Sequence, residues 1–273
     1  MRGGDDPRMI AGFRRSSNSF YRPAILDPAQ PMAISTADVA SQLKVVAGER
    51  ERRAGLPGLL AKVTALKAFQ QRRFALTYDD LLRSARHGAA ARFFLDELYG
   101  PSDFTRRDAQ FARVAPAVAR VFPDQVAETV AILADLHALS EVLDSAMAMQ
   151  LGDASIAPID YVRAWQRVDR ASDRRRQIEL VLRIASHLDR VTRLPLLRNA
   201  LRLMRAPARA AGLGELQRTL ETGFDTFRAM KGADEFIATI DAREREFAAD
   251  LFAARIDDAE DAMLAKALVH LPP

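Results

Sequence analysis

Residues 93–108 read FFLDELYG followed by PSDFTRRD. The first half combines aromatic and aliphatic side chains with two acids, and Gly100-Pro101 is a strong signal for the end of a helix. Asp103 is a suitable N-cap for a second helix. The stretch therefore predicts a corner at which two helices meet. Its candidate functional residues are Phe93, Phe94, Tyr99, Asp103 and Arg107.

Helix signals recur on both sides of this corner. Apolar residues at helical spacing follow Pro57, and a long periodic segment runs from Pro123 to Leu151. Pro158 and Pro195 are placed to begin further helices. No segment shows the alternation of a strand, and no fixed-period repeat is evident. We therefore predict an all-α fold, a compact bundle of about nine or ten helices.

Composition agrees with that prediction. Hydrophobic residues make up 49% of the 273 residues, which is enough to bury a substantial core. Only 7% of the residues are aromatic, while Ala, Leu and Arg dominate, and these three favour helix over sheet.

The chain divides into three parts by composition. Residues 1–31 are rich in Gly, Ser and Pro and lack a helical period, so we expect a disordered or loosely packed extension, with Met32 as a candidate native start. Residues 32–255 form the expected single helical domain. Residues 256–273 carry an acidic cluster and are interpreted as a tail or a frayed helix.

Charge argues against a nucleic-acid partner. The net charge is +4, with 36 acids interspersed among 40 basic residues, of which 35 are Arg and five are Lys. Such a mixed surface is typical of a solvated protein, although an Arg-rich surface suits bidentate binding of carboxylates or phosphates. The absence of Cys excludes disulfides and thiol chemistry. With no apolar window long enough to span a membrane and no signal core, we expect a cytoplasmic protein.

Polar residues on otherwise apolar helix faces are the candidates for chemistry, because a buried ionisable group must be paired or ligated. Asp108 lies between Phe104 and Phe111 on one such face, and His137 shares a face with two acids. The candidate buried polar cluster is Glu97, Asp108, His137, Glu141 and Asp144.

A metal or acid–base site is one interpretation of this cluster. A di-iron carboxylate bundle needs Glu-x-x-His pairs, which the sequence lacks, and only four His residues are present. A buried network that fixes the register of the helices is the favoured alternative. No metal or cofactor is identified from the sequence.

Other residues are given structural interpretations. Tyr161 and Trp165 are one helical turn apart and are expected in the core, with a ligand cavity as the alternative. His187 and Asp189 are expected at the surface. The run Arg174-Arg175-Arg176 lies near a helix N-terminus, where phosphate binding is conceivable.

The stretch at residues 93–99 resembles a bacterial protein family named for the motif Phe-Phe-Leu-Glu-Glu-Leu-Tyr. The similarity extends over about residues 57–245, including the segments 136–141, 161–165 and 227–230. This chain has Asp96 where the family name has Glu, an acid-for-acid change expected to cost little. The resemblance implies no activity, substrate or cofactor.

Three functions remain open from the sequence. We favour a non-enzymatic helical interaction or scaffold protein with a protein partner, in which the corner at residues 93–108 is a hinge or a docking surface. The first alternative is a metal-dependent or ligand-binding helical-bundle enzyme that uses the buried polar cluster, and the second is nucleic-acid binding through the Arg-rich surface.

Overall fold

The structure is a computed structural model that describes residues 36–97, 109–115, 124–152, 155–194, 196–258 and 260–273. The predicted extension at residues 1–31 and the corner residues Tyr99, Asp103 and Arg107 lie outside these ranges. Twelve helices have both ends within them, and residues 109–115 are helical as well. The twelve are α1 Thr36–Gly55, α2 Leu59–Thr77, α3 Asp79–Arg83, α4 Gly88–Glu97, α6 Asp124–Gln150, α7 Pro158–Val168, α8 Ala171–Val191, α9 Leu197–Leu203, α10 Arg205–Ala210, α11 Gly214–Met230, α12 Asp234–Ala253 and α13 Ala262–Val269.

The all-α prediction is confirmed, since the described ranges contain helices and no strand. The number of helices exceeds the predicted nine or ten because short helices fill the connections. The segment expected to begin at Pro195 forms two helices that separate at Met204, with Pro207 inside the second. Part of the segment interpreted as a C-terminal tail forms α13, which Asp261 caps by accepting a hydrogen bond from the Leu264 backbone N–H at 2.8 Å.

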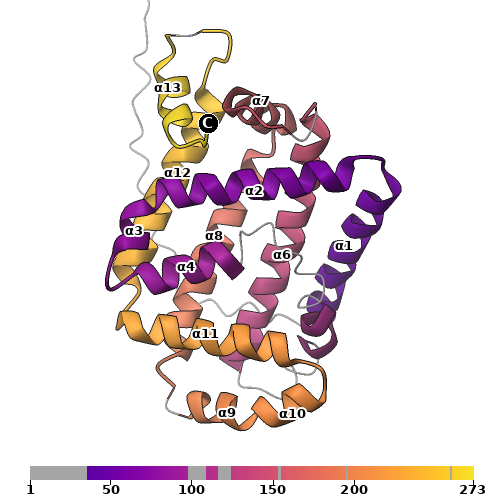
Figure 1. The fold of residues 1–273 in the computed structure, drawn as a ribbon, viewed down its shortest axis with the longest axis vertical. Coiled ribbons are helices and arrows are strands. Elements are labelled where there is room, and N and C mark those ends of the chain that lie inside the picture. The colour runs from indigo at the N-terminus through magenta and orange to yellow at the C-terminus, as the bar shows by residue number, and fades with distance from the viewer. Residues whose placement is uncertain (1–35, 98–108, 116–123, 153–154, 195, 259) are drawn as a thin grey trace, which may run out of the picture. The chain divides into compact units, whose positions relative to one another are not determined.

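Helix α6 is the centre of the arrangement. It packs against α1 along one side and α8 along another, and α12 packs on the far side of α8 (Figure 1). Helices α2 and α11 run across this group, and α4 lies between them (Figure 1). Because α6 has neighbours on several sides, its buried residues surround most of its circumference, and polar residues on it are buried too.

The core consists of packed clusters rather than one seam. The largest joins α2 to the end of α6, to α7, to α12 and to α13, and includes Leu66, Phe69 and Met147. A second cluster joins α4, α11 and α12 around Phe94 and Phe227. Leu264, Ala267 and Leu271 belong to the first cluster, so the C-terminal residues are part of the folded core. A core of this kind holds the polar residues of neighbouring helices in fixed positions.

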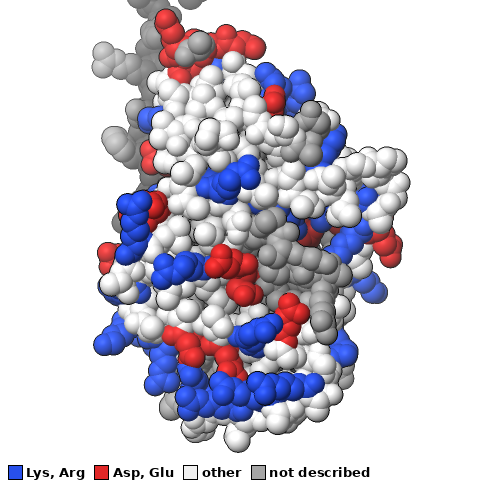
Figure 2. Space-filling view, in the orientation of Figure 1, with Lys and Arg blue, Asp and Glu red and all other residues white. Residues whose placement is uncertain are grey.

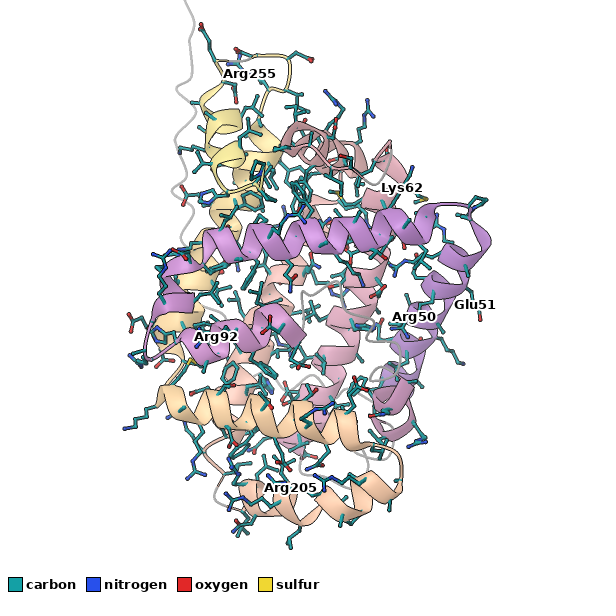
Figure 3. All side chains as sticks on the ribbon, viewed as in Figure 1. Arg50, Glu51, Lys62, Arg92, Arg205 and Arg255 are labelled. Carbon is teal, nitrogen blue, oxygen red and sulfur yellow. The ribbon has the colours of Figure 1, made fainter. Side chains whose placement is uncertain are left out.

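Charged side chains of both signs are spread over the face shown in Figure 2. Some of them connect helices: Lys62 of α2, labelled in Figure 3, donates through Nζ to the carbonyl oxygen of Leu151 at 2.7 Å, and Arg92 of α4 donates to that of Leu82 at 2.8 Å. Within the described part of the chain, no helix is both long enough and apolar enough to cross a lipid bilayer.

Candidate functional site

The structure divides the predicted polar cluster. Glu141 and Asp144 are buried on the face of α6 that meets α1 and α2, and His137 is half-buried one turn before Glu141. Glu97 instead lies at the junction of α4 and α11, where it accepts a hydrogen bond from Thr219 Oγ1 at 3.0 Å. Asp108 lies outside the described residues. The structure therefore places Glu141 and Asp144 together in the interior and puts Glu97 at a different junction.

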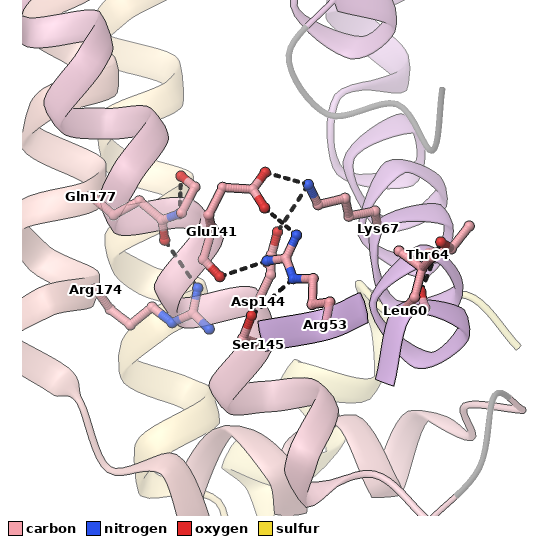
Figure 4. Close-up of polar contacts among 10 residues, drawn as sticks. Arg53, Leu60, Thr64, Lys67, Glu141, Asp144, Ser145, Arg174 and Gln177 are labelled. Atoms are coloured by element: carbon pink, nitrogen blue, oxygen red, sulfur yellow. Dashed lines mark hydrogen bonds and ion pairs between the residues drawn. The ribbon is translucent and has the colours of Figure 1, made fainter. Parts of the chain in front are cut away.

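Glu141 is held by cations from two other helices (Figure 4). Arg53 of α1 forms an ion pair with Glu141 Oε2, and its Nη2 donates to the Glu141 carbonyl oxygen at 2.8 Å. Lys67 of α2 donates to Glu141 Oε1 at 2.6 Å and lies 3.8 Å from Asp144 Oδ2. Arg53 Nε also donates to Ser145 Oγ at 2.9 Å. These contacts connect α1, α2 and α6 through one carboxylate.

This environment sets the protonation state of Glu141. Burial alone would raise its pKa, but Lys67 and Arg53 outweigh burial and hold the pKa at about 2. Burial raises the pKa of Asp144, and the adjacent Glu141 adds to that effect. A carboxylate with a pKa of about 2 is a poor proton acceptor near neutral pH. The arrangement therefore suits a structural ion-pair network, which is the alternative favoured from the sequence.

Metal binding would need a different arrangement. Both oxygens of Glu141 are occupied by cations, and no group of three or more His, Asp or Glu side chains among the described residues is arranged to hold a metal ion. A carboxylate that coordinates a metal ion must have an oxygen that is free to donate electron density to the metal. The described members of the predicted cluster thus do not assemble into a metal site.

The two aromatic residues that open the corner pack against other helices. Phe94 is 1% exposed, and its ring lies 5.7 Å from that of Phe227 and 5.9 Å from that of Phe236 between centroids. Phe93 packs against Gly223 of α11, where a Cβ atom would lie 2.8 Å from Phe93 Cζ. Among the described corner residues, Asp96 is exposed, whereas the two aromatic side chains are engaged in packing within the protein.

We expect Gly223→Ala to destabilise the protein by about 1–3 kcal/mol, because the added methyl group overlaps the rigid Phe93 ring. Chemical denaturation measures the change. Gly48→Ala is the matched control: Gly48 also lies within a helix, nothing lies within 4 Å of its added Cβ, and the change should stabilise by up to about 1 kcal/mol. Equal effects of the two substitutions would contradict close packing of α4 on α11.

Tyr161 and Trp165 are buried, as predicted, whereas His187 and Asp189 are buried rather than exposed. The error arises because α8 has neighbours on more than one side. His187 Nδ1 lies 3.3 Å from Thr129 Oγ1, and its Nε2 lies 3.5 Å from Glu128 Oε1. Burial lowers the pKa of His187, and Glu128 opposes that effect.

A second buried polar group was not among the sequence candidates. Arg73 of α2 donates two hydrogen bonds to Glu244 of α12, at 2.5 and 3.0 Å, and Tyr78 Oη donates to the same carboxylate at 2.7 Å. Burial raises the pKa of Glu244, but Arg73 and the hydrogen bond from Tyr78 outweigh it, so the pKa is lowered. Glu244 lies on the apolar face that carries Ile240 and Phe247, so the criterion applied to Asp108 would have found it.

A cavity of about 60 Å³ lies beside this group. Arg73, Glu244 and Trp165 line it together with Arg174 of α8. The guanidinium carbon of Arg174 is 4.0 Å from the centroid of the Trp165 ring, so the two groups stack. The cavity thus combines buried cations with an aromatic wall.

Comparison with known proteins identifies the family of the chain but gives no activity. No curated protein and no solved structure matches it significantly. The family model described as "Domain of unknown function (DUF8198)" matches residues 49–258, which include the Glu141 network, the Arg174 cavity and the described part of the corner. The chain belongs to the DUF8198 family.

Proposed function

We propose that this chain is a non-enzymatic helical interaction protein, and that it binds an acidic amphipathic helix of a partner protein on the exposed face of α9 and α10. The observation that carries the proposal is the exposure of Leu196 and Leu203, which are 77% and 78% exposed. Large apolar side chains at this level of exposure mark interaction surfaces when they share a face with other apolar residues.

The two leucines share such a face. They are seven residues apart, which places them two helical turns apart on one side of the helix. Ala206, Pro207 and Ala210 continue that side along α10, and all three are exposed. We call these five residues the α9–α10 strip. Helix α9 has no buried residue, so it contributes little to the core that would explain its apolar side chains.

Charge beside the strip indicates the chemistry of the partner. Residues 196–211 include four Arg and no acid. Arg198 and Arg205 form ion pairs with Asp225 and Glu221 of α11, and the labelled Arg205 in Figure 3 points towards α11.

Arg202 and Arg209 are also exposed, and no ion pair joins either to another residue of the described ranges. In Figure 2, basic side chains gather where Figure 1 shows α9 to α11. A partner helix that carries aliphatic side chains flanked by carboxylates would complement this surface.

A protein partner fits these features better than a membrane or nucleic acid. Helices that lie on membranes carry a long, strongly basic polar face and often Trp or Phe on the apolar face. The α9–α10 strip contains neither Trp nor Phe, and two of the four neighbouring Arg residues are already paired with acids of α11. A duplex would be bound by unpaired cations and would gain nothing from two exposed leucines.

The test begins with photo-cross-linking in the cells that naturally make this protein. A photoreactive amino acid is incorporated in place of Leu203, and incorporation in place of Val269 is the control. Val269 of α13 is 77% exposed, which matches Leu203 in exposure on a different helix. We expect a protein to cross-link at 203 and not at 269. The cross-linked protein is then purified, and its affinity is measured directly.

We expect Leu203→Glu to weaken that affinity by about 2 kcal/mol, or roughly thirty-fold, because it places an acid on a surface suited to an acidic partner. Val269→Glu should leave the affinity unchanged. Cross-linking to a second copy of this chain, a Leu203-dependent association with anionic vesicles instead of a protein, or equal effects of the two substitutions would each overturn the proposal.

A further inference from the structure

Arg174 is a buried cation whose hydrogen-bonding capacity is only partly used. Its side chain is 5% exposed, and its Nη1 donates to Gln177 Oε1 at 3.0 Å. Its Nη2 is buried and has no hydrogen-bond partner among the described residues. A buried guanidinium without a partner for one of its donors is costly, so this atom is a place where a ligand oxygen would be stabilised.

The carboxylates near Arg174 are engaged elsewhere. Glu244 is occupied by Arg73 and Tyr78, and Asp144 has Lys67 as its ion-pair partner. Burial lowers the pKa of Arg174, and the nearby Tyr161 and Asp144 oppose that effect only in part. The charge of Arg174 is therefore incompletely balanced by the residues around it.

The cavity in front of Arg174 has space for more than water. Its volume of about 60 Å³ is several times the roughly 10–15 Å³ that one water molecule needs. Apart from the polar groups already named, its walls are largely apolar and include Phe74, Phe94, Phe247 and Ile178. Water molecules would find few hydrogen-bond partners on these walls, whereas the apolar end of a small molecule would pack against them.

We infer that this cavity binds a small monocarboxylate. Its carboxylate accepts a hydrogen bond from Arg174 Nη2, and its short hydrocarbon end packs against the aromatic wall formed by Phe74, Phe94 and Phe247. Arg73 Nε and Trp165 Nε1 also line the cavity and are buried without a hydrogen-bond partner among the described residues. Trp165 is neutral and Arg73 is balanced by Glu244, so Arg174 supplies the one incompletely balanced charge. One such charge beside apolar walls suits one carboxylate better than a phosphate, which carries more charge. This site is independent of the α9–α10 strip and of the proposed function.

The chain offers a built-in reporter for the test. Trp165 is its only tryptophan, and it both lines the cavity and stacks on Arg174. Tryptophan fluorescence therefore reports on this site alone. We would titrate the full chain with acetate, propionate, butyrate and valerate, with sodium chloride and inorganic phosphate at the same ionic strength as controls.

We expect a saturable fluorescence change with at least one carboxylate, an affinity that passes through an optimum as the acid lengthens, and no saturable change with chloride or phosphate. Arg174→Met, which keeps much of the side-chain volume, should weaken binding at least tenfold. Arg175→Gln is the matched control, since Arg175 is exposed on the same helix turn, and it should bind as the wild type does.

Two results would overturn the inference. One is the absence of a saturable change with every acid, which would assign Nη2 to bound water. The other is binding that chloride or phosphate reproduces, or that Arg174→Met leaves intact. If Arg174→Met does not fold, the chain-length series on the wild type decides alone: a cavity of limited volume gives an optimum length, whereas nonspecific apolar association only strengthens as the hydrocarbon chain lengthens.

Discussion

Glu141→Gln is expected to destabilise the protein by about 3–5 kcal/mol, measured by denaturant unfolding. Glu141 is 4% exposed, and it is the shared partner of Arg53 and Lys67. The amide keeps the shape of the side chain but removes its charge. Arg53, which is 5% exposed, is then left buried without its counter-charge, and that is the origin of the loss.

Glu51→Gln is the matched control for this substitution. Glu51 lies on α1 close to Arg53 in the sequence, but its side chain is exposed, so the same chemical change should alter stability by no more than about 0.5 kcal/mol. The double substitution Arg53→Met with Glu141→Leu should recover much of the loss, since it removes both members of the buried pair. A loss from Glu141→Gln no greater than that of the control would refute the network.

The same network gives a dependence of stability on pH. The pKa of Glu141 is lowered in the folded protein from its ordinary 4.5 to about 2. Its ionisation therefore stabilises the fold fully above pH 4.5, and this contribution is lost as the pH falls towards about 2. We expect the free energy of unfolding of the wild type to fall more steeply than that of Glu141→Gln across this interval. Asp144 is present in both proteins, but Glu141→Gln also removes the neighbouring charge that helps to raise the pKa of Asp144, so the difference between the two curves reports on the Glu141–Asp144 pair.

The helices were predictable because their ends are marked locally. Pro158 begins α7, as the sequence indicated, and the predicted periodic segment from Pro123 to Leu151 corresponds to α6, which Gly152 follows. These residues act through backbone conformation, which depends on few neighbours. The separation of α9 from α10 at Met204 has no such signal, since the nearest helix-disrupting residue, Pro207, falls inside α10.

The pairing of polar residues was not predictable in the same way. Helical spacing placed Glu141 and Asp144 on one face, but it could not name Arg53, which is 88 residues away in the sequence. The run of three Arg at 174–176 looked like one basic cluster. The structure buries Arg174 and exposes Arg175, because neighbouring side chains on a helix point about 100° apart. The side of a helix that a residue occupies follows from local spacing, whereas the residue with which it pairs depends on how distant segments of the chain pack together.

Phe94→Ala is expected to destabilise the protein by about 3–5 kcal/mol, because it leaves a cavity where the ring contacts Phe227 and Phe236. Denaturant unfolding measures the loss, and Phe94→Leu should retain part of the stability because it fills part of the space. Asp96→Glu is the control within the same motif: Asp96 is exposed, so restoring the acid of the family name should change stability by at most about 0.5 kcal/mol. If Asp96→Glu had the larger effect, the motif would serve a contact that the exposed acid makes; the larger effect at Phe94 would assign the motif to the packing of α4 on α11 and α12.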